Sequence, residues 1–184
     1  MNKVLIVIKP DGVQRGLVGE ITARFERAGF RILAQKTVKV DIDFALRHYP
    51  GPDEWLKTVG ERSLSEYQKA GLDPKKVFKT EDPKEIGKVV RRWLAEFLSS
   101  GPVVAMVLTG NNAVENGRRL AGSTVPSLAA PGTIRGDFSL DSASLANAEA
   151  RPIKNLVHVS GTPEEAEYEI GLWFTPEEIL EARV

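Results

Sequence analysis

Two short apolar runs, residues 4–8 and 103–108, limit most strongly what this chain can fold into. Each run is continuous and rich in β-branched side chains, which is typical of a strand covered on both faces. A turn signal at residues 10–12 ends the first run, and apolar residues then recur at helical spacing over residues 17–28. Residues 31–40 alternate loosely between apolar and polar side chains. The chain therefore opens with a strand, a helix and a second strand that has one solvent-facing side.

The middle of the chain is predicted to be helical. The strongest helical signal has Asp82 as the N-cap and Pro83 at the first helical position, and its wide apolar stripe extends to Leu98. The stretch before it is polar and less regular, and it indicates short helices at residues 55–59 and 64–67.

The second half of the chain shows the same strand–helix–strand order as the first. After the run at residues 103–108, Asn112 predicts the N-cap of another helix, and a loop rich in Gly, Pro and Ser follows over residues 122–136. Residues 138–140 indicate a short strand, and the Ala- and Ser-rich residues 141–150 are expected to be exposed.

A capping box formed by Thr162 and Glu165 predicts the start of the final helix. The overall order is strand–helix–strand, helices, strand–helix–strand. It matches an α+β fold, a ferredoxin-like antiparallel sheet with helices packed on it. The 184 residues contain no repeat and no linker, so we expect a single domain over residues 1–184.

Composition and charge exclude several classes of function. The absence of Cys removes thiolate nucleophiles and Cys-based metal sites, and two His leave little from which to build a metal cluster. Lys and Arg together number 25, as do Asp and Glu, and this balance argues against nucleic acid or an anionic membrane surface as partners. The apolar run after Met1 is too short for a signal peptide, and no run approaches the ~20 residues of a membrane span. We therefore expect a cytoplasmic protein.

A small set of cations and one imidazole could carry chemistry. A lone His is more often structural than catalytic, and His48 fits that interpretation more easily than His158, which precedes the last helix. Lys9 ends the first strand, Arg118 lies within a helix, and Arg135 stands between a Thr-Ile pair and a Gly in a glycine-rich loop. Guanidinium and ammonium groups suit phosphate oxygens, so these residues suggest phosphoryl chemistry. The glycine pattern is not that of a Walker loop.

Five sequence segments occur in a fixed order across nearly the whole chain. They are residues 8–16, 100–107, 131–138, 155–158 and 169–174. Together they resemble the nucleoside diphosphate kinase family. Several long motifs in order are far more specific than a single short match. The resemblance implies an enzyme that moves the γ-phosphate of a nucleoside triphosphate to a nucleoside diphosphate through a phosphohistidine, in a ping-pong cycle with broad base specificity.

The resemblance also implies roles for residues around the nucleophile. His158 matches the nucleophile, Glu169 matches the carboxylate that supports it, and Ser160 matches a hydroxyl near that carboxylate. A neutral imidazole nitrogen is a good nucleophile near pH 7, while an acceptor must hold the other ring nitrogen. Tyr49 matches the ring packed beside the nucleophile. Lys9, placed above at the end of the first strand, matches a contact to the sugar hydroxyls.

Further positions match contacts to the nucleotide. Asn155 joins Lys9 at the sugar, and the phosphate contacts match three residues, Arg118, Thr124 and Arg135. Val90 and Leu94 fall where the family has its apolar platform for the base. In the family, Mg²⁺ bridges phosphate oxygens and is held mostly by the nucleotide and water, which agrees with the absence of a predicted protein metal site. The family also assembles into hexamers or into tetramers built from dimers, so we expect a homo-oligomer that uses ATP and other nucleoside tri- and diphosphates.

The chain departs from the family pattern in two ways. It carries extra residues at roughly 50–99 and 139–154, the first of them largely helical. Val159 replaces the usual Gly after the nucleophile and requires an extended backbone there, while Gly161 replaces a usual acidic residue. A family-like domain that binds nucleotides without transferring phosphate is the alternative. The expected sign of such a domain is loss of His158, Lys9 or Arg135, and all three are present.

Overall fold

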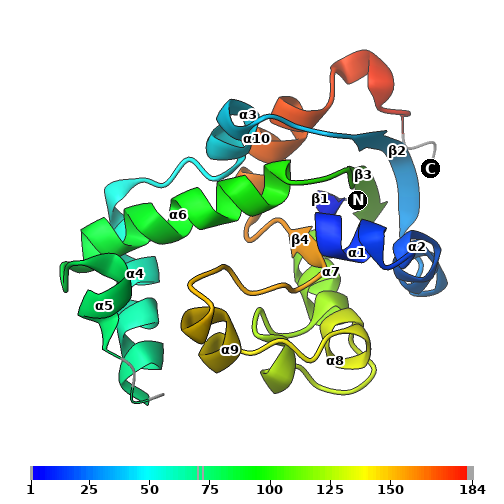
Figure 1. Cartoon of the computed structure of the whole chain (residues 1–184). Coiled ribbons are helices and arrows are strands. Elements are labelled where there is room, and N and C mark those ends of the chain that lie inside the picture. The colour runs from blue at the N-terminus through cyan, green and yellow to red at the C-terminus, as the bar shows by residue number, and fades with distance from the viewer. Residues whose placement is uncertain (1, 70, 72, 182–184) are drawn as a thin grey trace.

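A single antiparallel sheet forms the centre of the protein. The structure, a computed structural model, describes residues 2–69, 71 and 73–181. In these residues a four-stranded sheet has the order β2-β3-β1-β4, with antiparallel pairing throughout (Figure 1). The predicted fold class, an α+β fold with a ferredoxin-like antiparallel sheet, is confirmed. The strands are β1 (Asn2–Ile8), β2 (Arg31–Val38), β3 (Val103–Gly110) and β4 (Val157–Val159).

Helices cover both faces of the sheet, which explains the uninterrupted apolar runs of β1 and β3. Alternate residues of a strand point to opposite faces. Val4, Ile6 and Ile8 therefore pack on the side of α2 (Val18–Arg27) and α7 (Ala113–Ala121). Leu5 and Val7 pack on the other side, and every residue of β3 is buried. The helices of that second side are α3 (Ile42–His48), α6 (Pro83–Ser99) and α10 (Pro163–Trp173).

The stretch before α6 forms one long helix, so the prediction of two short helices was wrong. This helix is α4 (Asp53–Lys69), and α5 (Pro74–Phe78) follows it. The helix is polar because it lies away from the sheet (Figure 1). It gains its stability from packing on α6, since a Cβ at Gly87 would lie 2.0 Å from the Leu56 carbonyl oxygen and one at Gly60 1.7 Å from that of Pro83. Glycine at these positions lets the two helix backbones approach closely.

Residues 138–150 also differ from the prediction. Residues 138–140 form no strand, because Phe138 ends the short helix α8 (Ile134–Phe138). Residues 141–150 are not an exposed excursion. They contain α9 (Ala143–Ala148), in which Ala146 is buried, and the Tyr67 hydroxyl of α4 donates to the Asn147 carbonyl oxygen at 3.0 Å. Helices α4 and α9 are therefore in contact.

Two sequence signals at helix starts were right in position and differ in detail. The first strand ends before residues 10–12 as predicted, but these residues belong to a short helix, α1 (Pro10–Gln14), in which Pro10 occupies the first position. Asn112 occupies the N-cap position of α7 as predicted, but it has φ +43° and its side chain makes no capping hydrogen bond. By contrast, Asp82 caps α6 as predicted, accepting from the amides of Lys84 and Glu85. The remaining elements are the 3₁₀ turns η1 (Pro126–Leu128) and η2 (Pro176–Glu178).

Candidate active site

A cavity of about 500 Å³ opens beside β4. Distant segments line it: the end of β1, the turn after α3, the start of α4, the end of α7 with its following loop, and α10. Most of the residues singled out from the sequence meet here. They are Lys9, Tyr49, Leu94, Arg118, Thr124, Arg135, Asn155, His158 and Glu169.

His158 lies in the middle of β4 with one ring nitrogen held by the protein. Its Nε2 is 2.8 Å from Glu169 Oε1, and the Ser160 hydroxyl donates to Glu169 Oε2 at 2.7 Å. The Ser160 oxygen accepts from the Leu5 amide at 3.2 Å, so β1 fixes this network. A proton on Nε2 is the one that can be donated to the carboxylate, which leaves the lone pair of Nδ1 unprotonated. Nδ1 is therefore the ring nitrogen whose lone pair is available for chemistry.

His48, expected to be only structural, stacks directly beside His158. The ring centroids of His48 and His158 are 4.4 Å apart in an edge-to-face arrangement. The indole N–H of Trp173 donates to His48 Nδ1 at 3.2 Å, so this nitrogen must be unprotonated. Burial lowers the pKa of His48 well below its ordinary value, and the neighbouring His158 and Lys9 lower it further. His48 is thus neutral, and it adds no second positive charge beside the nucleophile.

Two buried cations face the cavity. Arg135 donates to three backbone carbonyls, those of Asn155, Gly122 and Val157, at 3.1, 2.6 and 2.8 Å. Burial, followed by the charge of Arg118, lowers the pKa of Arg135 to about 10. Burial and the charge of Arg135 likewise lower the pKa of Lys9 to about 8. Positive charges packed together and bonded to neutral oxygens favour an anionic ligand.

The segment just before His158 is held in an unusual conformation. Asn155 accepts from Lys9 Nζ at 2.8 Å, and its side-chain amide donates to the Thr124 carbonyl oxygen at 2.8 Å. Leu156 has φ +69°, a left-handed conformation that costs a branched residue free energy. The Leu156 amide donates to the buried carboxylate of Asp11 at 3.1 Å. Sequence reasoning missed the role of Asp11, although it lies within the first matching motif.

Comparison with known proteins identifies the family. The family model described as nucleoside diphosphate kinase matches residues 2–55 and 84–179. The chain belongs to the nucleoside diphosphate kinase family. The nucleoside diphosphate kinase of Pyrobaculum aerophilum is 51% identical over 181 residues, which cover 98% of this chain and 99% of that protein. The internal residues outside the family match, 56–83, include most of α4 and all of α5.

Solved structures of the family have the same architecture. The crystal structure of an NDP kinase from Pyrobaculum aerophilum superimposes with a TM-score of 0.96 at 50% identity, covering 98% of this chain and 99% of that chain. A nucleoside diphosphate kinase from Borrelia burgdorferi, described as a transition-state mimic with bound vanadate and ADP, gives a TM-score of 0.77 at 36% identity. That match covers 100% of this chain and 92% of that chain.

Two of the residues expected at the site do not line the cavity. Val90 packs in the small hydrophobic cluster of α4, α5 and α6 together with Phe78. Ser160 is fully buried behind Glu169, where it contacts the carboxylate and not the cavity. Trp55, in the first turn of α4, does line the cavity, as does Leu94. The sequence offered one signal for this role, because Trp55 is an aromatic residue that follows soon after Tyr49.

The departures from the family pattern around residue 160 are accommodated locally. Val159 is part of β4, so its backbone is extended as expected. Glu165, in the first turn of α10, accepts from the Gly161 amide at 2.8 Å. A Cβ at position 161 would lie 2.4 Å from Glu165 Oε2, so this carboxylate occupies the space next to Gly161. A side chain at position 161 would therefore displace Glu165.

Proposed function

We propose that this chain transfers the γ-phosphate of a nucleoside triphosphate to a nucleoside diphosphate through a phosphohistidine on His158. The observation that carries the proposal is the ring of His158, with Nε2 held by Glu169 and Nδ1 left to attack. The Nδ1 lone pair forms a bond to the γ-phosphorus, the bond to the β–γ bridging oxygen breaks, and the diphosphate leaves with that electron pair. A second diphosphate then takes the phosphate from Nδ1, and the imidazole regains its lone pair.

The surrounding residues compensate charge and orient the substrate. Arg118, Thr124 and Arg135 contact the phosphates in our proposal, while Lys9 and Asn155 contact the sugar hydroxyls. Their arrangement around one cavity supports these assignments. Phosphoryl transfer gains mainly from positioning and from stabilising the developing charge. Glu169 stabilises the positive charge that forms on the imidazole during attack.

Two aromatic residues complete the proposed pocket. Tyr49 packs edge-to-face beside His158, with ring centroids 6.4 Å apart. Burial, followed by the charge of Glu169, raises the pKa of its hydroxyl, so Tyr49 stays neutral. Trp55 and Leu94 form an apolar platform for the base. A platform that contacts the face of the base does not read its hydrogen-bonding edge, so broad base specificity follows.

We expect Mg²⁺ to enter with the nucleotide. In the described part of the chain, His48, His158 and Glu169 place potential ligand atoms within 4.8 Å of one another. Hydrogen bonds already occupy His48 Nδ1 and His158 Nε2, and Mg²⁺ prefers oxygen ligands in an octahedron. These three residues therefore do not form a Mg²⁺ site, and we expect phosphate oxygens and water to supply the ligands of the ion. The protein contributes cations to the phosphates.

A labelling experiment tests the proposal. The pure protein is incubated with γ-labelled ATP and Mg²⁺ and is then chased with GDP, in parallel with His158→Ala. We expect acid-labile, alkali-stable label on the wild type that passes to GTP on the chase. The chain has two His, so absence of label on His158→Ala assigns the phosphate to His158. Bound nucleotide without any label on the wild type would contradict the proposal and favour a regulatory nucleotide-binding domain.

Assembly and location stay predictions. We propose a homo-oligomer, either a hexamer or a tetramer of dimers, which light scattering coupled to size-exclusion chromatography would measure. No helix among the described residues combines the length and apolar character needed to cross a bilayer. The cytoplasmic location, the absence of a nucleic-acid partner and the single domain with extra residues at 50–99 and 139–154 stay predictions as well.

A further inference from the structure

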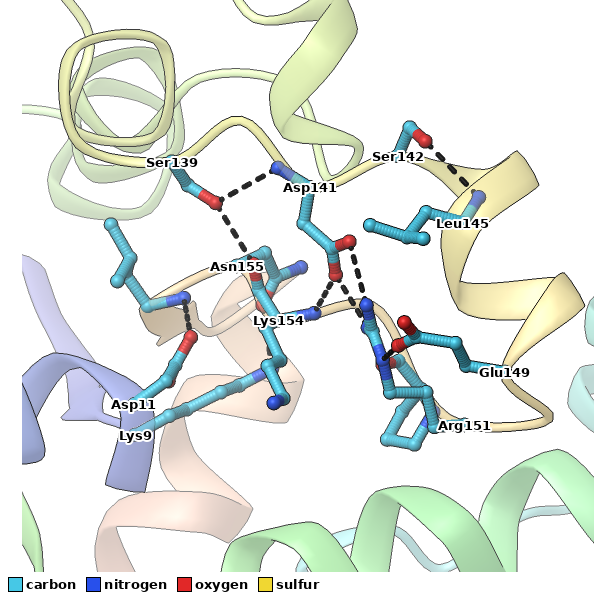
Figure 2. Close-up of polar contacts among 12 residues, drawn as sticks. Lys9, Asp11, Ser139, Asp141, Ser142, Leu145, Glu149, Arg151, Lys154 and Asn155 are labelled. Atoms are coloured by element: carbon cyan, nitrogen blue, oxygen red, sulfur yellow. Dashed lines mark hydrogen bonds and ion pairs between the residues drawn. The ribbon is translucent and has the colours of Figure 1, made fainter.

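Asp141 is a buried carboxylate that lies outside the cavity and is fully engaged by its neighbours. Arg151 donates to both of its oxygens, from Nη1 to Oδ2 at 2.7 Å and from Nη2 to Oδ1 at 3.0 Å (Figure 2). The Lys154 amide donates to Oδ2 at 2.6 Å. Burial alone would raise the pKa of Asp141, but these hydrogen bonds outweigh it and lower the pKa. Asp141 is therefore charged, and Arg151 holds it in one orientation.

Two side chains of one loop, Ser139 and Asp141, hold the backbone of Lys154, and we call this pair the clamp. While Asp141 accepts from its amide, the Ser139 hydroxyl donates to its carbonyl oxygen at 3.0 Å. The amide of Asp141 donates to the Ser139 oxygen at 3.4 Å, which links the two halves of the clamp (Figure 2). The pair of Asp141 and Arg151 that anchors this loop is charge-assisted and bidentate, and such hydrogen bonds fix geometry more tightly than neutral ones. The backbone of Lys154 consequently has little freedom.

Asn155 follows the clamp directly and faces the nucleotide site. Its side chain bonds Lys9 and the Thr124 carbonyl, and its own carbonyl oxygen accepts from Arg135. Leu156, the next residue, is left-handed at φ +69°, and a strained residue persists only where its surroundings over-determine it. The Asp11 carboxylate accepts from the Leu156 amide, and the clamp holds the backbone of Lys154 before it. The clamp is thus the upstream restraint on Asn155.

We infer that Asp141, oriented by Arg151, is a positioning residue that sets Asn155 and, through it, the Lys9 ammonium for nucleotide binding. The inference rests on the proposed function, because Asn155 and Lys9 are its proposed nucleotide contacts. Asp141 touches no substrate. Its effect is confined to the nucleotide side of the site, because Glu169 and the pairing of β4 with β1 hold His158 independently.

A merely structural ion pair would behave differently. If the pair of Asp141 and Arg151 only stabilised the loop around α9, its loss would lower the melting temperature and leave the nucleotide affinity of the folded protein unchanged. A positioning role predicts weaker nucleotide binding by folded protein. It also predicts that His158 keeps its reactivity toward a small phosphoryl donor, such as phosphoramidate, that needs no sugar contact.

The experiment compares Asp141→Asn and Ser139→Ala with Glu149→Gln in the full chain. Glu149 is a matched control, because it is the half-exposed second partner of Arg151 and does not contact Lys154. We expect Asp141→Asn to raise the KM for ATP and for GDP roughly tenfold, because a neutral amide weakens one charge-assisted hydrogen bond. Ser139→Ala should raise it by a smaller factor. Glu149→Gln should match the wild type, and phosphorylation of His158 by phosphoramidate should be unchanged in all three.

The outcomes separate the possible failures. Wild-type KM values in folded Asp141→Asn and Ser139→Ala would overturn the inference, and so would an equal loss of phosphoramidate and ATP reactivity. Failure of the wild type to label from ATP would instead overturn the proposed function. If Asp141→Asn does not fold, Ser139→Ala still removes one side of the clamp. A double-mutant cycle with Asn155→Ala gives a final check, because Asp141→Asn should add little once Asn155 is gone.

Discussion

Replacing Lys9 by methionine is expected to stabilise the nucleotide-free protein while removing a nucleotide contact. The Lys9 ammonium is buried at the end of β1, with Asn155 accepting its hydrogen bond and Arg135 nearby. Burial and the positive charge of Arg135 lower the pKa of Lys9 from 10.5 to about 8. Folding therefore makes this group harder to charge. Methionine fills a similar volume without any charge.

The size and the sign of the effect follow from the pKa of Lys9. Because the folded pKa is lowered, the unfolded chain binds the proton more tightly, and charged Lys9 costs about 3 kcal/mol of stability below pH 8. This cost disappears as the pH rises from about 8 to 10.5. Losing the hydrogen bond to Asn155 costs about 1 kcal/mol at every pH. Lys9→Met should thus be more stable by about 2 kcal/mol at pH 7 and less stable by about 1 kcal/mol above pH 10.5.

Urea unfolding of the wild type and Lys9→Met at pH 7, 8, 9 and 10 measures this difference. Other groups titrate in both proteins, so their contributions cancel when the two free energies of unfolding are subtracted. Lys3→Met is the control, because Lys3 is exposed on the same strand and its replacement should change stability by less than about 0.5 kcal/mol. Lower stability of Lys9→Met at pH 7, or a difference that does not change between pH 7 and 10, would refute the reasoning.

Three further tests, one of them with a control substitution, address other parts of the molecule. Glu169→Gln should slow labelling of His158 by ATP roughly 10- to 100-fold, because a neutral amide stabilises the developing imidazolium less; an unchanged rate constant in rapid quench would contradict this. Trp55→Ala should raise the KM for ATP and GTP alike by about tenfold through loss of stacking, and selective loss of one base would argue against a shared platform. Gly87→Ala should destabilise the protein by about 2 kcal/mol or more because α4 leaves no space for a Cβ, whereas Gly19→Ala, in open space on α2, should stabilise it by about 0.5–1 kcal/mol in thermal melts.

Local patterns predicted the elements whose stability depends on local signals. The continuous runs at β1 and β3 and the Asp82 cap of α6 follow from side-chain periodicity and capping chemistry, which act within a few residues. The patterns failed at α4 and α9. The polar sequence of α4 favoured two short helices, and the Ala- and Ser-rich sequence around α9 favoured an exposed loop. Both are held by contacts between regions far apart in sequence, which no local pattern reports.

The candidate site divides in the same way. Motif resemblance selected residues that the fold then brings to one cavity, His158, Glu169 and Arg135 among them. It also pointed to Val90, which packs inside the helical cluster, and it overlooked Trp55. Val90 and Leu94 lie one turn apart on α6, and the packing of α4 and α5 against α6 takes the Val90 side chain into a separate cluster, which no count along the sequence reports.

The amino-acid sequence by itself determined strands β1, β2 and β3, the Asp82 cap of α6 and the choice of His158 as the candidate nucleophile, because apolar periodicity and a specific motif are properties of neighbouring residues. Only the tertiary structure decided the chemistry of His158. Its free Nδ1 depends on Glu169 returning from α10, and its uncharged neighbour depends on Trp173 meeting His48. Hydrogen bonding and loss of solvent set protonation states, and both arise only when distant segments pack against one another.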